Sequence, residues 1–306
     1  MEYKAKQIPQ VDALAYKGTP EKPDIKIFVS HRIDLDSETI DNPLYIPVRC
    51  GAVYDEREGI TMLGDDTGDN ISDKRLSFCE LTVQYWAWKN IKADYYGFCH
   101  YRRYLSFSDE QFEVKDGSYV HEKYITKEIT QKYGLLESQM RKEIEPYDAI
   151  FSTASVVDQL SGAPETNYEY YQKRQHLFSG TEAVDLLIRI VKEKYPQYGP
   201  DVDLYFSSSS GTFNNCFIMK KAVFDDYSQW LFSILFEFEK RIDVSKYSLQ
   251  RMRAPAFMSE PLRGIYFLHQ QRTEPLRVAP PHQLVFLSVQ NAFLISAPSL
   301  RQLMFQ

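Results

Sequence analysis

Residues 64–105, GDDTGDNISDKRLSFCELTVQYWAWKNIKADYYGFCHYRRYL, decide the fold that this sequence predicts. They open with an acidic loop, residues 64–70, in which glycines permit positive φ and Asp and Asn side chains bond nearby backbone. A helix follows, because Ser77 and Glu80 have capping-box spacing and apolar residues then recur on one face. Residues 95–99 are typical of a short buried strand.

The predicted strand leads directly into His100-Tyr101-Arg102-Arg103. Ligands of open α/β sheets bind beyond the carboxyl ends of the strands, so a histidine and two arginines there favour an anion site. The arginines could neutralise a diphosphate through bidentate bonds, or form ion pairs with the aspartates of the acidic loop. His100 could orient a phosphate, or be a buried histidine bonded to backbone.

The rest of the chain alternates between strands and helices. The predicted strands are 25–31, 44–52, 148–152 and 213–219, and the predicted helices are 125–145, 168–178, 179–195, 224–242 and 255–269. This alternation predicts an α/β fold with a mostly parallel central sheet flanked by helices. Residues 1–24 are interpreted as a loose leader, 25–271 as the main domain with a helical C-terminal elaboration, and 272–306 as a tail packed on it.

Composition limits the class of protein. The 306 residues are 43% hydrophobic and 14% aromatic, enough for one large α/β domain. The net charge of −6 argues against nonspecific binding to nucleic acid, which needs a dominant basic surface. The four cysteines are too widely spaced to indicate a zinc knuckle or a disulfide framework. With no signal peptide and no run of about 20 apolar residues, we expect a cytoplasmic protein that could sit on the inner membrane face.

Three groups of polar residues have both a chemical and a structural interpretation. The acidic loop could hold a divalent metal or bond a nucleotide, although a solvated turn that caps the next helix is the favoured interpretation. Asn214 and Asn215 could read sugar hydroxyls, although Asn beside a turn is usually structural. Glu260 could be a general base, but Ser259 and Glu260 could equally mark a helix start.

Five motifs, in order along the chain, resemble one known family. They are GDDTGDNIS, CELTVQYWAWKN, YYGFCHYRRY, NNCFIMKK with the following FDDYSQWLF, and FMSEPL. They resemble the bacterial capsular and exopolysaccharide glycosyltransferases, often described only as a domain of unknown function. The resemblance covers roughly residues 25–269. It implies a GT-A-like (Rossmann-type) fold, a UDP-sugar donor of galactose or galactofuranose, and a glycan acceptor on a lipid carrier.

GT-A enzymes usually carry an Asp-x-Asp motif at the end of a central strand, where it holds a metal on the donor diphosphate. Here the strand at residues 95–99 occupies that place, and no carboxylate follows it. We therefore expect no metal cofactor, with Arg102 and Arg103 as the counter-charge for UDP. Lys74, Arg75 and the helix N-terminus would assist. The competing interpretation keeps Mn²⁺ or Mg²⁺, held by the acidic loop.

The resemblance gives each candidate residue an expected role. The residues expected on the donor are Ser30, His31, Asp65, Asp69, Asn70, Lys74, His100, Arg102 and Arg103. Those expected on the acceptor are Tyr168, Glu169, Gln172, His176, Asn214 and Asn215. The ligands of the competing metal interpretation are Asp65, Asp66 and Asp69. Glu260 is the expected base that deprotonates the acceptor hydroxyl.

Two features depart from the family. Pro261 stands where the family more often has a basic residue, which could alter the turn around Glu260. Residues 272–306 do not resemble the family, and they could pack on the domain or contact a membrane near the acceptor. Two other functions stay open: a non-catalytic nucleotide-sugar or glycan-binding protein, and a metal phosphohydrolase built on the acidic loop. The second is disfavoured because no further ligands at metal spacing accompany that loop.

Overall fold

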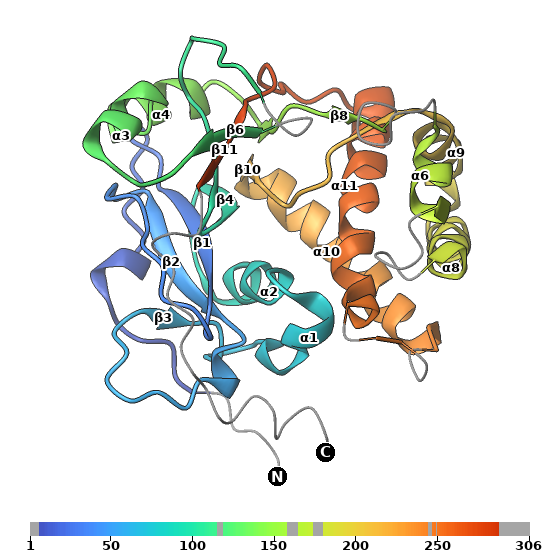
Figure 1. Ribbon diagram of the computed structural model, residues 1–306, viewed down its shortest axis with the longest axis horizontal. Helices are drawn as coiled ribbons and strands as arrows, with labels where there is room; N and C mark the ends of the chain where they lie inside the picture. The colour runs from blue at the N-terminus through green and yellow to red at the C-terminus, as the bar shows by residue number, and fades with distance from the viewer. Residues whose placement is uncertain are drawn as a thin grey trace.

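A mixed sheet forms the centre of the computed structural model, which describes residues 6–114, 119–157, 165–173, 180–243, 247–248 and 250–287 (Figure 1). The strands of this sheet are β1 (Ile25–Arg32), β2 (Tyr45–Cys50), β3 (Leu63–Gly64), β4 (Tyr95–His100), β5 (Arg103–Leu105), β6 (Tyr119–Glu122), β7 (Ala149–Phe151), β10 (Phe217–Lys220) and β11 (Leu284–Leu287). A separate ribbon pairs β8 (Ser155–Val156) with β9 (Ser210–Gly211). The α/β class predicted from the sequence is confirmed.

The part of the sheet in the order β3-β2-β1-β4 is parallel. β1 is buried along all but its last residue, because both faces of the sheet are covered here. Its side chains alternate, so that Phe28 packs into one core while Ile27 and Val29 pack into the other. The carboxyl ends of these four strands share one edge, which brings the segments after β3 and β4 to the same side of the sheet.

Helices cover both faces. One face packs against α3 (Lys127–Lys132) and α4 (Glu137–Ile144). The other face carries α1 (Arg75–Phe78), α2 (Leu81–Asn90), α6 (Asn167–Lys173), α8 (Gly180–Lys194), α9 (Gly199–Ser207), α10 (Lys221–Arg241) and α11 (Ala254–Thr273). In Figure 1, α6, α8 and α9 are grouped beyond α11, away from the sheet. No helix within the described ranges combines the length and the apolar character needed to span a membrane.

The remaining strands extend the sheet with mainly antiparallel pairs. β10 lies antiparallel between β4 and β7, and β5 pairs with β4 at His100 and Arg103. β11 pairs antiparallel with β5 and parallel with β6. It comes from residues 272–306, for which the sequence predicts a tail packed on the domain. The described part of that region instead contributes a strand to the central sheet.

Two other segments, residues 6–24 and the helix α11, are better ordered than the sequence predicts. Residues 6–24 follow the domain surface, where Lys6 forms an ion pair with Asp66 and the Tyr16 hydroxyl donates to Asp94 at 3.0 Å. α11 continues through Pro261, although a proline removes one helical hydrogen bond. The proline therefore does not interrupt the helix that carries Glu260.

Candidate active site

A cavity of about 370 Å³ lies between the turn that follows β4 and the start of α11. It combines three arginines and two glutamates with four aromatic rings. Its lining residues are Glu80, Arg102, Arg103, Tyr119, Ser155, Tyr170, Phe213, Asn214, Gln250, Arg253, Ala256, Phe257 and Glu260. Its place at the carboxyl end of a parallel strand is where ligands of open α/β sheets bind.

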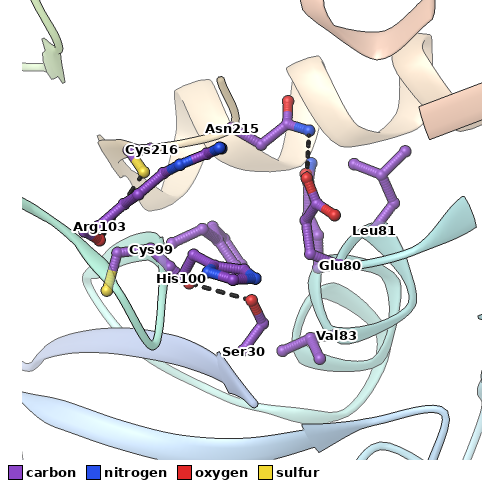
Figure 2. A pocket seen from close by; sticks show the side chains of 11 residues that line it. Ser30, Glu80, Leu81, Val83, Cys99, His100, Arg103, Asn215 and Cys216 are labelled. Carbon is purple, nitrogen blue, oxygen red and sulfur yellow. Dashed lines mark hydrogen bonds between the residues drawn. The ribbon is translucent and has the colours of Figure 1, made fainter. Parts of the chain in front are cut away.

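Glu80 lines this cavity because the backbone breaks directly before it. The single capped helix predicted from Ser77 is wrong: α1 and α2 are separate helices, and the Glu80 side chain forms no capping bond. Between them Cys79 has a φ of 49°. Positive φ is strained for a residue with a Cβ, and such strain clusters at functional sites. Asn215 Nδ2 donates to Glu80 Oε1 at 2.9 Å, a contact drawn in Figure 2.

Glu260 reaches the same cavity from α11. Burial raises the pKa of Glu260 to about 8, and the negative charge of Glu80 acts in the same direction. Arg263, Arg103 and Arg253 lower this pKa but do not cancel the rise. A carboxyl group whose pKa lies near neutral pH can take up and release a proton during a reaction, so Glu260 has the character of a general base.

The three arginines of the cavity have no carboxylate partner at ion-pair distance within the described residues. Arg102, Arg103 and Arg253 form no ion pair with any residue in the described ranges. Elsewhere the protein neutralises such groups, as where Arg75 pairs with Asp34 at 3.1 Å. The three guanidinium groups of the cavity outnumber its two glutamates, Glu80 and Glu260, and create a local positive field despite the negative net charge of the chain. The arrangement favours an anionic ligand.

Aromatic rings support two of these guanidinium groups. Arg102 lies over the ring of Phe286, 5.2 Å from its centroid, and Arg103 lies over Tyr119 at 5.6 Å. The Nε atoms of both arginines are buried and have no hydrogen-bond partner among the described residues. A buried donor without a partner costs about 1–3 kcal/mol, which a ligand bearing anionic oxygens would recover.

A smaller cavity of about 20 Å³ adjoins the first, and Glu80 and Arg103 line both. Ser30 and His100 lie on its walls (Figure 2). Ser30 Oγ donates to the carbonyl of Cys99 at 3.2 Å, while His100 Nδ1 is buried with no partner in the described part of the chain. Burial and the neighbouring arginines hold the pKa of His100 well below its ordinary value, so the ring is neutral.

Two predicted donor contacts are engaged elsewhere. The ring nitrogens of His31 lie 2.6 Å from Ser37 Oγ and 2.7 Å from Thr39 Oγ1, and burial lowers the pKa of His31 to about 4. Lys74 forms an ion pair with Glu239 of α10 at 2.9 Å. Neither residue lines the two cavities.

Asp65, another predicted donor contact, is fully buried. Its carboxylate accepts four hydrogen bonds, from the backbone N–H groups of Gly51 and Ala52 and from the hydroxyls of Ser72 and Thr82. These donors come from both sides of the acidic loop and fix it against the end of β2 and the start of α2. Asp65 is therefore a structural residue away from the cavity.

The rest of the acidic loop is also bonded within the protein. Asp66 pairs with Lys6, Asp69 accepts a bond from the Tyr85 hydroxyl at 3.2 Å, and Asn70 bonds to backbone on both sides of itself. None of the loop residues lines either cavity. Across the residues that the structure describes, no three His, Cys, Asp or Glu side chains gather as metal ligands would.

The predicted acceptor residues on α6 do not line the cavity. The Tyr168 hydroxyl donates to Asp185 of α8 at 2.9 Å, Glu169 bonds at the start of its own helix, and Gln172 is exposed. His176 lies outside the described residues. The sequence indicates a polar helix but does not settle which face of α6 meets the site.

Another face of α6 lies on the cavity. Tyr170 is buried there against Phe213, with 4.8 Å between ring centroids. The two predicted asparagines do reach the site: Asn214 lines the larger cavity and bonds Ser152 Oγ at 2.9 Å, and Asn215 lines the smaller one. Both are also structural, because each holds a neighbouring side chain.

The structure thus brings part of the predicted site together. The predicted residues that line the two cavities are Ser30, His100, Arg102, Arg103, Asn214, Asn215 and Glu260. Sequence analysis misses two charged members, Glu80 and Arg253. The capping-box spacing of Glu80 indicates a structural role instead of a role in the site. Arg253 could have been predicted from its position just before the helix of Glu260.

The sheet, its helices and the cavity at the strand ends define a GT-A-like α/β protein. Its sequence matches the family model described as a domain of unknown function, DUF4422, over residues 26–271, and the chain belongs to this family. Among solved structures it is similar to the apo structure of WbbM, a bifunctional glycosyltransferase, with 34% identity, 87% of this chain covered and a TM-score of 0.80. The chain spans 45% of the WbbM chain. No curated protein matches it.

Proposed function

We propose that this protein is a glycosyltransferase that moves a hexose from a UDP-sugar to a glycan acceptor. The observation that carries the proposal is the cavity with a glutamate of raised pKa and three arginines that form no ion pair within the described residues. Sugar transfer from a nucleotide diphosphate requires a binding site for an anionic substrate and a group that accepts a proton. The cavity offers both, at the end of a strand. The likeness to WbbM, itself a bifunctional glycosyltransferase, supports the same chemistry.

The donor diphosphate would lie against Arg102, Arg103 and Arg253. Guanidinium groups bind phosphate oxygens in bidentate geometry and stabilise the charge that develops as the diphosphate leaves. Arg102 and Arg103 follow the strand at whose end GT-A enzymes usually carry their metal-binding motif, so in this proposal donor binding needs no divalent ion. The smaller cavity beside Ser30 and His100 has room for about one water molecule, so the donor would occupy the larger cavity.

In the transfer step, Glu260 accepts the proton of the acceptor hydroxyl as that oxygen forms its bond to the anomeric carbon. The bond from the anomeric carbon to the diphosphate oxygen breaks with its electron pair, and UDP leaves. Because the pKa of Glu260 is raised to about 8, its ionised fraction in the free enzyme increases as pH rises through that value. The enzyme should therefore gain activity from pH 6 to pH 8.

The acceptor would approach along the aromatic side of the cavity. Tyr170, Phe213 and Phe257 line that side, and their faces can pack against sugar rings while Asn214 lies nearby. We propose a glycan of the capsular or exopolysaccharide type, carried on a lipid at the inner membrane face. Galactose or galactofuranose as the transferred hexose rests on the family resemblance described above.

The test is a thermal-shift titration with UDP, GDP and several UDP-hexoses, each with EDTA or Mn²⁺, followed by UDP release with glycan acceptors. We expect stabilisation by UDP in EDTA, since a ligand that binds the folded state raises its stability by RT ln(1 + [L]/Kd). Release of UDP should then depend on the acceptor. Binding that requires Mn²⁺ would contradict the arginine-based donor site.

A binding protein without turnover is the second candidate function. One observation favours it: Glu260 is largely protonated at neutral pH in the free protein, which weakens it as a base there. Tight UDP-sugar binding without UDP release at any pH between 6 and 9, with any acceptor tried, would support this alternative over transfer.

A further inference from the structure

A short chain of polar contacts runs from Glu80 to Ser259, the residue that precedes Glu260. Asn215 Nδ2 donates to Glu80 Oε1 at 2.9 Å, and Asn215 Oδ1 lies 3.1 Å from the hydroxyl of Ser259, the residue before Glu260. One amide group thus contacts the side chain of Glu80 and the neighbour of Glu260. The chain fixes Glu80 in the cavity that Glu260 lines.

The backbone next to Glu80 is held in its strained form from several sides. The thiol of Cys50 donates to the carbonyl of Cys79 at 3.0 Å, and Arg253 Nε donates to Cys79 Sγ at 3.1 Å. Strain of roughly 1–3 kcal/mol persists only where the surroundings over-determine the conformation. A residue that only capped a helix would not need this arrangement, so the placement of Glu80 calls for another explanation.

We propose that Glu80 is a positioning residue of the transfer reaction, whose fixed negative charge keeps Glu260 protonated in the resting enzyme and makes it a stronger base once ionised. The inference rests on the proposed function, because it gives Glu80 a task only if Glu260 is the base. The site would then use two carboxylates, Glu80 and Glu260, whereas the sequence predicts a role only for Glu260.

The charges around Glu260 determine what removal of Glu80 should do. The groups that act on Glu260 are Glu80 from the start of α2, Arg103 from β5, Arg253 and Arg263 at and within α11, and the hydroxyls of Tyr119, Tyr171 and Tyr205. Burial raises the pKa of each of these tyrosines, so they are neutral near pH 8. Without Glu80, only burial would still oppose the arginines, and Glu260 would ionise at lower pH.

The experiment follows the side-chain carboxyl signal of Glu260 by carbon NMR of protein labelled with ¹³C-glutamate, assigned by its loss in Glu260→Gln. We expect the titration midpoint to fall by about one pH unit in Glu80→Gln, because a like charge has been removed. Glu80→Asp keeps the charge and should stay near the wild-type midpoint. Glu137→Gln, which removes a carboxylate from a surface pair with Arg141, is the matched control and should change nothing.

The pH profile of kcat/KM for UDP release is the second readout. Its acid limb should move with the NMR midpoint in Glu80→Gln, and its plateau should be lower because Glu260 becomes a weaker base. An unmoved midpoint in Glu80→Gln overturns the inference, and Glu80→Ala gives the same decision if the glutamine variant does not fold. Absence of UDP release by the wild type would instead count against the proposed function, while the NMR titration still decides the coupling.

Discussion

The acidic loop after β3 and the arginine turn after β4 lie at the same edge of the sheet, yet they use their charges in opposite ways. Asp65 accepts four bonds from its own chain and Asp66 pairs with Lys6. Arg102 and Arg103 form no ion pair within the described ranges. β3 is an outer strand whereas β4 is central, and of the two segments only the turn contributes residues to the larger cavity. The comparison makes Arg102 and Arg103, and not the acidic loop, the residues that we expect to bind a ligand.

The largest expected effect on the arginine side is that of Glu260→Gln. Removing a general base typically lowers the rate by about 10²–10⁴-fold. We expect a loss of this size in UDP release with acceptor present, while the affinity for UDP alone stays within a few fold. Titration calorimetry with UDP provides the control. Turnover close to wild type in Glu260→Gln would remove this residue as the base.

A paired substitution compares the two regions directly. Arg103→Ala should weaken UDP binding by roughly tenfold to a hundredfold, as expected for loss of a charge-assisted hydrogen bond of about 1.5–3 kcal/mol. Asp69→Ala, in the exposed part of the acidic loop, should change UDP affinity less than twofold. Both are measured by calorimetry in EDTA. Equal losses in the two variants would mean that the loop also touches the donor.

The third test concerns the structural role of Asp65 in the acidic loop. Asp65→Asn presents an amide to four donors and should destabilise the fold by about 1–3 kcal/mol. Urea unfolding gives the change in stability, and UDP affinity of the folded fraction should remain as in wild type. A variant of normal stability that fails to bind UDP would return Asp65 to the donor site.

The last test is a pH-dependent difference in melting temperature between wild type and Glu260→Gln. The folded state raises the pKa of Glu260 from its ordinary 4.5 to about 8, so it retains a proton that the unfolded chain releases. Wild-type stability therefore falls as pH rises between these values, and Gln has no proton to lose. The melting temperature of Glu260→Gln should therefore rise relative to that of wild type from pH 6 to pH 9. A constant difference would show that the pKa is not raised.

Local sequence patterns are sufficient for the elements next to the site. Residues 95–103 combine a buried apolar strand with two arginines, and this contrast correctly places Arg102 and Arg103 at a strand end. Glu260 as the base stays a prediction, and the structure places it within α11 on the wall of the larger cavity. In each case the residue and its environment are neighbours in the chain, so short-range patterns contain the information.

Other site residues depend on information that is not local. Glu80 has the spacing of a helix cap, and only the backbone of Cys79 shows that the helix breaks there. Tyr168 and Tyr170 lie on the same short helix, and only the packing of Tyr170 against Phe213 shows that Tyr170 is the one on the cavity. β11 pairs with β5 through residues far apart in sequence, which no pattern within residues 272–306 reveals.

The position of β11 has a consequence for how the molecule is made. The strand that borders Arg103 comes from residues 284–287, beyond the segment shared with the family at 26–271. During synthesis one edge of β5 stays unpaired until β11 has been made, because contacts between distant residues form slowly. The arginine turn would be ordered among the last parts of the sheet, and a chain cut near residue 271 should have an exposed, aggregation-prone edge beside its donor site.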